Sequence, residues 1–215
     1  ILNIFDFTKL DYSDFRIAPF QQQYFDLVGI DTSRFIFVKH PIRVSSLIVP
    51  SLGFIGERYS NPDHFNRISC KSTPKTKTKK VWLSRSKFAT CEVEHINIHK
   101  VENILRDNGW LIVYPEELTL SEQLDLFREA RIVSGLEGSA FHTLAIVDQL
   151  PDLVVIFPRT IRTICQNDRT IAKVRNINQH VVRLEYEKLD PYGSILKIVD
   201  PYEPLNILIN LESTL

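Results

Sequence analysis

The second half of the chain alternates short apolar runs with segments whose apolar residues recur at helical spacing. Four runs are typical of buried strands, at residues 81–84, 111–114, 132–134 and 153–157, and residues 181–184 form a weaker fifth. Helical spacing follows at 95–107, after the capping box of Thr119 and Glu122, and at 139–149. Such alternation predicts βαβ units and a mainly parallel sheet. We therefore expect a Rossmann-like α/β domain over residues 81–215.

The first 70 residues have a weaker pattern, which predicts a partial α/β domain. Residues 21–28 are expected to form a helix that ends at Gly29, and residues 34–39 and 44–49 are expected to be strands. The segment 71–80, KSTPKTKTKK, is expected to be a solvated basic linker. A basic lip over an anionic ligand is the alternative. Nucleic-acid binding is disfavoured, because no aromatic residue stands among the lysines.

Composition is that of an ordinary globular protein. Hydrophobic residues make up 44% of the 215, and 26 Lys and Arg balance 26 Asp and Glu, so no net charge steers the chain toward nucleic acid or a membrane. Only seven residues are glycine, which excludes collagen-like, Gly-rich and most multi-hairpin β proteins. No apolar run is long enough to span a membrane, and the residues that follow Ile1 do not have the pattern of a signal peptide. Because the chain has no Met, we expect the natural protein to begin upstream of Ile1.

Metal and hydrolytic chemistry find little support in the sequence. Cys70, Cys91 and Cys165 are far apart and are typical of small buried hydrophobic residues. His95 and His99 stand four apart without the intervening Glu of a metalloprotease helix, and no G-x-S-x-G or Cys–His motif is present. We therefore expect neither a metal site nor a bound cofactor.

The richest candidate site is the segment Ser134-Gly-Leu-Glu-Gly-Ser-Ala-Phe-His142, which follows a predicted strand and opens a predicted helix. Ligands of parallel sheets bind beyond the carboxyl ends of the strands. Gly135 and Gly138 would let an anion approach the backbone, and the N–H groups of the helix start would point at it. The alternative is a tight connection in which Ser139 only caps the helix. Glu137 and His142 lie close to this turn and are the candidate acid–base groups.

Further candidates follow the neighbouring strands. Arg85 comes directly after the first strand and would share the rim with Gly138, where it suits phosphate recognition, and Lys87 would add a positive charge. Glu116 and Glu117 follow the second strand and would accept hydrogen bonds from a ribose or a base. For each of these side chains, an ordinary solvated surface role remains the alternative.

The order of these segments resembles glycosyltransferase family 61. The resemblance covers roughly residues 20–160 and rests on VWLSR at 81–85, NGWLIVYPEE at 108–117, LSEQLDLF at 120–127 and ARIVSGLEGSAFH at 130–142, together with YFDLVGIDTSR at 24–34 and LIVP at 47–50. It implies a GT-B enzyme with two Rossmann-like domains, in which residues 1–70 are part of the acceptor-side domain and residues 81–215 bind the donor. It also implies inverting, metal-independent transfer from a nucleotide-sugar, with UDP as the expected nucleotide, to a glycan or polysaccharide.

The resemblance assigns roles by position. Arg85, Gly138, Ser139 and Ala140 would hold the diphosphate, Glu116 would lie near the nucleoside, and Gln123 would be the glutamine of the family's helix. Many members carry a histidine where this chain has Glu137, so the turn resembles a bacterial-type variant. The family's Asn-Glu pair at a helix start also appears here only as Asn97-Ile98.

Two other functions stay open at the level of sequence. A nucleotide-sugar epimerase needs a similar diphosphate site and similar acid–base groups. A non-catalytic nucleotide- or glycan-binding module would explain the small N-terminal part and the missing histidine. The location would be cytoplasmic, in some cases membrane-associated, in a bacterium, or the lumen of the secretory pathway in a eukaryote. Sequence says nothing about the oligomeric state, the sugar or the linkage.

Overall fold

The computed structural model describes residues 17–38, 42–49, 53–55, 59–87, 93–160, 164 and 166–215. Their contacts divide the chain into two compact units, Ile1–Ser51 and Leu52–Leu215. This division differs from the expected one, because the basic segment 71–80 lies within the second unit and its last two residues begin a strand.

The second unit is built on a five-stranded sheet in the order β5-β3-β6-β7-β8, in which every neighbouring pair is parallel. Its strands are β3 (Lys79–Leu83), β5 (Leu111–Val113), β6 (Ala130–Leu136), β7 (Leu153–Phe157) and β8 (Gln179–Val181). All five residues of β7 are buried. Six of the seven residues of β6 are also buried, and the exception is Arg131. Strands buried on both faces are typical of a parallel sheet covered by helices, so the predicted α/β class with a parallel sheet is confirmed.

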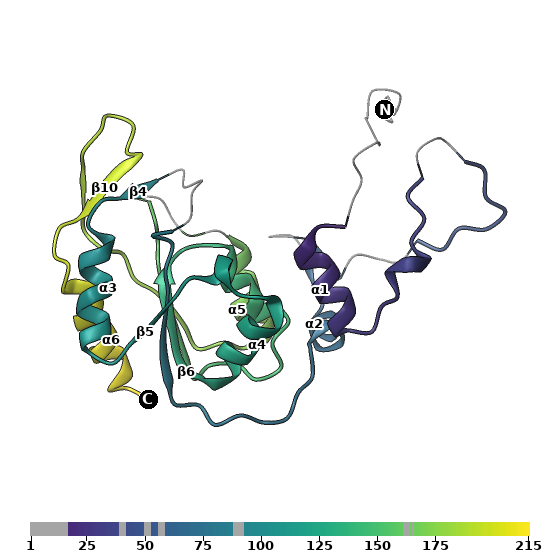
Figure 1. The fold of residues 1–215 in the computed structure, drawn as a ribbon, viewed down its shortest axis with the longest axis horizontal. Helices are drawn as coiled ribbons and strands as arrows, with labels where there is room; N and C mark the ends of the chain where they lie inside the picture. The colour runs from purple at the N-terminus through teal and green to yellow at the C-terminus, as the bar shows by residue number, and fades with distance from the viewer. Residues whose placement is uncertain are drawn as a thin grey trace. The chain divides into compact units, whose positions relative to one another are not determined.

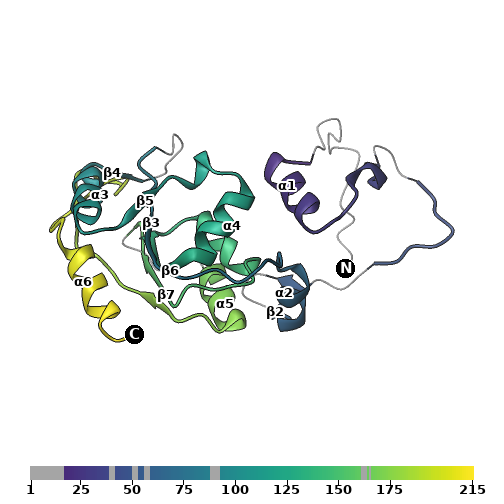
Figure 2. The ribbon, with the colours of Figure 1, turned by 60° about the horizontal axis from the view of Figure 1, so that its bottom comes forward.

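Helices cover both faces of this sheet (Figure 1). One side carries α3 (Ile98–Asp107) and α6 (Glu203–Glu212), and the other carries α4 (Leu120–Glu129) and α5 (Gln166–Arg175), an arrangement that Figure 2 shows from a second direction. Trp82, Ile132, Val155 and Phe157 point toward α3 and α6 and form the larger core cluster with residues such as Leu105. The layers follow from the alternation of side chains along each strand.

A second, three-stranded sheet lies beside α3. Its strands are β4 (Glu94–His95), β10 (Ile195–Ile198) and β9 (Tyr186–Lys188), with β10 parallel to β4 and antiparallel to β9. The buried Asn97 extends this pairing, since its side-chain amide donates to the carbonyl of Ile198 at 2.8 Å and accepts from the N–H of Ile198 at 2.9 Å. The amide thereby ties the start of α3 to β10.

The segment that leads into β3 is held along the second unit. The N–H of Ser72 donates to Asp148 at 2.8 Å, Lys77 pairs with Asp152 at 2.7 Å, and Lys79 pairs with Glu129. The remaining elements of this unit are β1 (Phe54–Ile55), β2 (Tyr59–Ser60) and α2 (Pro62–Ile68). Residues 71–80 are therefore attached to the rest of the second unit by ion pairs, which is a different arrangement from a freely solvated linker.

In the first unit, the predicted helix is present as α1 (Pro19–Leu27), and Gly29 follows it with a φ of +72°, which favours glycine. The strand predictions are wrong for the described residues. Residues 32–34 form a short 3₁₀ helix, η2 (Thr32–Arg34), and residues 35–38 and 42–49 are in no strand. Ile36 and Ile48 are 87% and 89% exposed, so no partner strand covers these apolar residues.

Of two further sequence predictions for the second unit, one is confirmed and one is wrong. The capping box forms at the start of α4, where the N–H of Thr119 donates to Glu122 at 2.7 Å and the N–H of Glu122 donates to Thr119 at 3.3 Å. The α-helix expected at 139–149 is instead a seven-residue 3₁₀ helix, η4 (Ser139–Ala145). The reason is tertiary, because the carbonyls of Ile146 and Val147 accept from the N–H of Cys70 and the guanidinium of Arg175 instead of continuing a helix.

Candidate functional site

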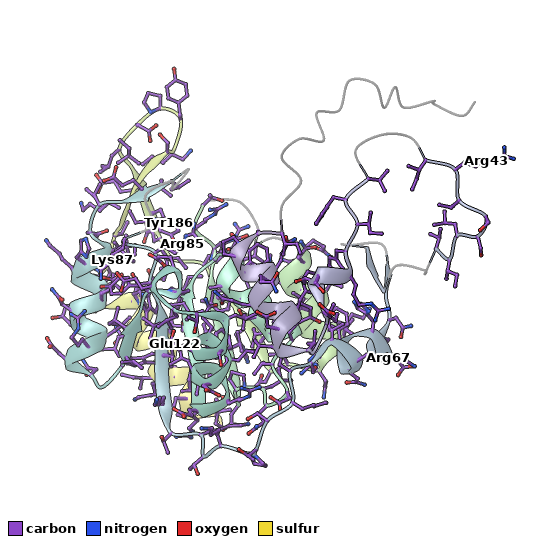
Figure 3. All side chains as sticks on the ribbon, turned by 45° about the vertical axis from the view of Figure 1, so that its right-hand side comes forward. Arg43, Arg67, Arg85, Lys87, Glu122 and Tyr186 are labelled. Atoms are coloured by element: carbon purple, nitrogen blue, oxygen red, sulfur yellow. The ribbon has the colours of Figure 1, made fainter. Side chains whose placement is uncertain are left out.

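The five parallel strands end at one edge of the sheet, where the loops after β3, β5, β6 and β7 meet. The sequence prediction placed Arg85 and Gly138 together there, and the structure does bring them together. A Cβ atom at Gly138 would overlap the guanidinium of Arg85, so the arginine packs directly against the glycine backbone. Because φ at Gly138 is −179°, the glycine is needed for space and not for backbone conformation. Figure 3 labels Arg85 and Lys87 in this region.

Arg85 is supported from beneath by a buried carboxylate that the sequence did not indicate. Glu102, on α3, is 1% exposed and accepts from the hydroxyls of Ser84 and Ser86, the two residues that flank Arg85. The Ser86 N–H also donates to the Ser84 hydroxyl at 3.0 Å. These bonds hold the loop after β3 in one conformation, which positions the arginine between the two serines.

A cavity of about 340 Å³ opens beside Arg85. It is lined by residues from the ends of β3, β6 and β7, from β4 and from the start of α3, namely Arg85, Ser86, Val93, Glu94, His95, Ile96, Ile98, His99, Leu136 and Arg159. Two guanidinium groups therefore share one cavity, with imidazoles and short apolar side chains between them. Arginine pairs of this kind suit the oxygens of a phosphate or diphosphate.

His95 is one of the polar residues that line this cavity. Burial lowers the pKa of His95 to about 4; a hydrogen bond with the backbone of Arg159 opposes this effect, and the charges of Arg85 and Arg159 add to it. Its ring lies 5.5 Å from that of Tyr186, whose hydroxyl donates to the carbonyl of Pro158 at 2.8 Å. Burial, together with the carboxylates of Glu203 and Glu137, raises the pKa of Tyr186. His95 and Tyr186 are therefore both neutral near pH 7.

The candidate acid–base residues lie at the same edge. His142, on η4, is 41% exposed, and its Nε2 is 3.4 Å from Oδ1 of Asp168, whose side chain is only 2% exposed. Burial, together with the nearby Glu137 carboxylate, raises the pKa of Asp168 to about 7. Burial lowers the pKa of His142. The structure thus brings Glu137 and His142 together around a second carboxyl group, that of Asp168, which the sequence did not reveal.

The polar residues after β5 form a separate surface cluster. Lys87 pairs with Glu117 at 2.8 Å, and its ammonium lies 3.9 Å from the centre of the Tyr114 ring, so the loops after β3 and β5 are joined. Glu116 is exposed. Gln123 donates to the carbonyls of Pro115 and Leu118 at 2.9 and 3.3 Å, so its amide fastens the loop after β5 to α4.

Two features of the predicted glycine turn need correction. Gly135 lies inside β6, where a Cβ would come within 2.6 Å of the carbonyl oxygen of Leu83, so this glycine serves the close approach of two strands. Gly138, not Ser139, is the N-cap of η4. With Ser139 and Ala140 in a short 3₁₀ helix, the anion-binding N-terminus of a full α-helix that the sequence predicted is not formed.

The sequence analysis assigned no ligand-binding or acid–base role to four residues of the site: Glu102, His95, Arg159 and Asp168. Arg159 follows a predicted strand, so its position alone could have indicated it. The other three stand on elements that only the tertiary structure brings to this edge. Within the described part of the chain, no group of three or more His, Cys, Asp and Glu is placed to hold a metal ion. No helix among the described residues is long and apolar enough to cross a membrane.

Comparison with known proteins identifies the family. The glycosyltransferase 61 family matches residues 12–156, well over half of the 215-residue chain. No match was found among curated proteins or among solved structures. The matched range includes β3, β5, β6 and β7, and with them Arg85, Glu102, Gly138 and His142. The chain belongs to the glycosyltransferase 61 family.

Proposed function

We propose that the protein transfers a sugar from a nucleotide-sugar, UDP-linked, to a hydroxyl group of a glycan or polysaccharide. The observation that carries the proposal is the packing of Arg85 against Gly138 at the mouth of a cavity that Arg159 also lines. Two fixed guanidinium groups suit a diphosphate, which is the leaving group of such a donor. The family supports the reaction class.

The proposed reaction is a single displacement with inversion. The acceptor oxygen forms a bond to the anomeric carbon while the bond from that carbon to the phosphate oxygen breaks, and the electron pair leaves with the diphosphate. Arg85 and Arg159 stabilise the charge that develops there, so the proposed transfer needs no metal ion. The proton of the acceptor hydroxyl passes to a base at the same edge, for which Glu137 and His142 are the candidates.

The domain assignment remains part of the proposal. Residues 81–215 would be the donor-binding domain of a GT-B enzyme, and residues 1–70 would belong to its acceptor-side domain. The bacterial-type form of the turn around Glu137 likewise stays a prediction. Lys87, Glu116 and Ser139 are expected to lie near the donor, at its edges.

Calorimetric titration with UDP and UDP-sugars tests the donor site. We expect Arg85→Ala and Arg159→Ala each to weaken nucleotide binding about 10- to 100-fold, the loss of one or two charge-assisted hydrogen bonds. Arg106→Ala is the matched control, because Arg106 is an exposed arginine at the end of α3 that bonds only to Asn103 among the contacts described. If all three variants bound the nucleotide as tightly as the wild type, the cavity would not be the donor site.

Gly138→Ala tests the same contact from the other side. Its added methyl group displaces the Arg85 guanidinium without straining the extended backbone, so nucleotide binding weakens while the melting temperature stays close to that of the wild type. Product analysis with and without an acceptor sugar then separates the reactions. Binding without transfer to any acceptor would favour a non-catalytic module, and conversion of the donor sugar without acceptor would favour an epimerase.

A further inference from the structure

His142 and Asp168 face each other from two elements that are 26 residues apart in the chain. The imidazole is half-exposed on η4, and the carboxyl group is almost wholly buried in the first turn of α5. Nε2 of His142 is 3.4 Å from Oδ1 of Asp168. One end of this pair is therefore accessible from the edge of the sheet, and the other end is enclosed by protein.

The surroundings of Asp168 are unusual for a buried carboxyl group. Among the described residues, no donor is in good hydrogen-bonding geometry with Oδ1, and the nearby charge from the loop after β6 is the carboxylate of Glu137, of the same sign. A buried carboxylate without strong donors is costly, and natural proteins retain such groups mainly where they serve a function.

A purely structural ion pair in the same unit has a different geometry. The Arg128 guanidinium is 5% exposed and donates to Asp148 at 2.8 Å and to Asp125 at 2.9 Å, and it also bonds to the carbonyl of Cys70. Every part of that cluster serves to join segments of the fold. The His142–Asp168 pair is longer, joins no further backbone group through its side chains among the described contacts, and leaves the imidazole accessible.

We propose that Asp168 is a positioning residue for His142, which it prepares to act as the base of the transfer reaction. The inference rests on the proposed function. The ionised Asp168 carboxylate accepts the proton on Nε2, so that the neutral imidazole carries its lone pair on Nδ1. Nδ1 then takes the proton of the acceptor hydroxyl as that oxygen bonds to the anomeric carbon. His142 becomes an imidazolium, which the carboxylate stabilises, and the diphosphate leaves with its electron pair.

The same pair responds to pH. The groups that face Asp168 are His142 from η4 and Glu137 from the loop after β6. With a pKa of about 7, the Asp168 carboxyl group is protonated below that pH and donates to Nε2, which places the imidazole proton on Nδ1 and removes the base. Above about pH 7 the carboxylate accepts from Nε2, and the base is restored. We therefore expect kcat to rise with pH through about 7.

Nitrogen NMR of the ligand-free protein tests the pairing without any turnover. In the wild type at pH 8, the His142 resonances should show the proton on Nε2. In Asp168→Asn the side-chain amide donates to Nε2, so the proton should move to Nδ1. Asp63→Asn is the matched control, since Asp63 is an exposed acid in the first turn of another helix, α2. It should leave the His142 tautomer unchanged.

Kinetics provide the second measurement. Asp168→Asn should lower kcat about 10²- to 10⁴-fold, with little change in the KM for the donor, and should abolish the rise of kcat near pH 7. If this variant fails to fold, Asp168→Ala and the wild-type tautomer at pH 5 and pH 8 answer the same question. A wild-type proton on Nδ1 at pH 8, or a tautomer that Asp168→Asn leaves unchanged, overturns the positioning role.

The outcome for Asp168 can be distinguished from that for the proposed function. Nucleotide binding that fails in the wild type, with the tautomer as expected, overturns the donor proposal and, with it, the role of His142 in transfer, but it supports the pairing. Normal binding and turnover in Asp168→Asn, with a shifted tautomer, overturns His142 as the base and leaves Glu137 as the candidate.

Discussion

Two buried carboxyl groups lie near the carboxyl edge of the sheet, Glu102 from the face covered by α3 and Asp168 from the face covered by α5. Glu102 accepts hydrogen bonds from the hydroxyls of Ser84 and Ser86. Oδ1 of Asp168 has no hydrogen-bond donor among the described residues and faces a half-exposed imidazole. The same functional group, equally buried, therefore supports a loop in one environment and responds to pH in the other. The difference lies in the donors that each face of the sheet supplies.

The largest expected effect is on how the stability of the protein depends on pH, which should differ between the wild type and Asp168→Asn. The folded-state pKa of Asp168, about 7, lies above its usual value of 3.8, so the folded protein keeps a proton that the unfolded chain releases. Stability from this group is greatest below pH 4 and falls as pH rises to about 7. The difference in the free energy of unfolding between Asp168→Asn and wild type should shift by about 4 kcal/mol in favour of the variant between pH 4 and pH 8.

Urea unfolding at several pH values measures this shift. The lowered pKa of His142 acts in the opposite direction, as stability lost when pH falls through 6.5, but it is present in both proteins and largely cancels in the difference. A difference that is independent of pH would mean that folding does not raise the pKa of Asp168.

The next effect concerns the support beneath Arg85. Glu102→Ala leaves the hydroxyls of the buried Ser84 and the half-buried Ser86 without their carboxylate acceptor and should lower the free energy of unfolding by about 3 kcal/mol. Nucleotide binding should weaken as well, because the loop that carries Arg85 is released. Chemical denaturation and calorimetry measure the two effects, with Lys100→Ala, an exposed position of α3, as control. Unchanged binding would show that Arg85 holds its position without Glu102.

The smallest effect isolates one of the two hydroxyls. Ser86→Ala removes the 3.2 Å bond to Oε2 of Glu102 and the 3.0 Å bond between the two serine hydroxyls, but leaves the bond from the Ser84 hydroxyl to Glu102 in place. We expect a loss of about 1 kcal/mol in the free energy of unfolding. Glu102→Gln retains one acceptor oxygen and should lie between Ser86→Ala and Glu102→Ala. If Ser86→Ala cost as much as Glu102→Ala, the two hydroxyls would act as one cooperative unit and not as separate donors.

The sequence analysis succeeded where local pattern and tertiary context agree. The run at 153–157 is a strand with the same bounds, because five consecutive apolar residues need a position buried on both faces. The strands expected at 34–39 and 44–49 have the same apolar character but no partner in the described residues, and a strand cannot form without one. The helix α5 was missed because few of its residues are apolar, and it is held by Arg175, which bonds to Ser69 and Val147.

Sequence alone determined the parallel α/β class, the meeting of Arg85 with the Gly138 turn, and the family, because each depends on local residue patterns and on the rule that parallel strands end at one edge. Tertiary structure alone decided which groups lie behind that edge. Glu102 is 17 residues from Arg85 and Asp168 is 26 from His142. Their burial and partners depend on how helices pack on the sheet, and the hydrogen-bond donors that this packing supplies are what distinguish two equally buried carboxyl groups.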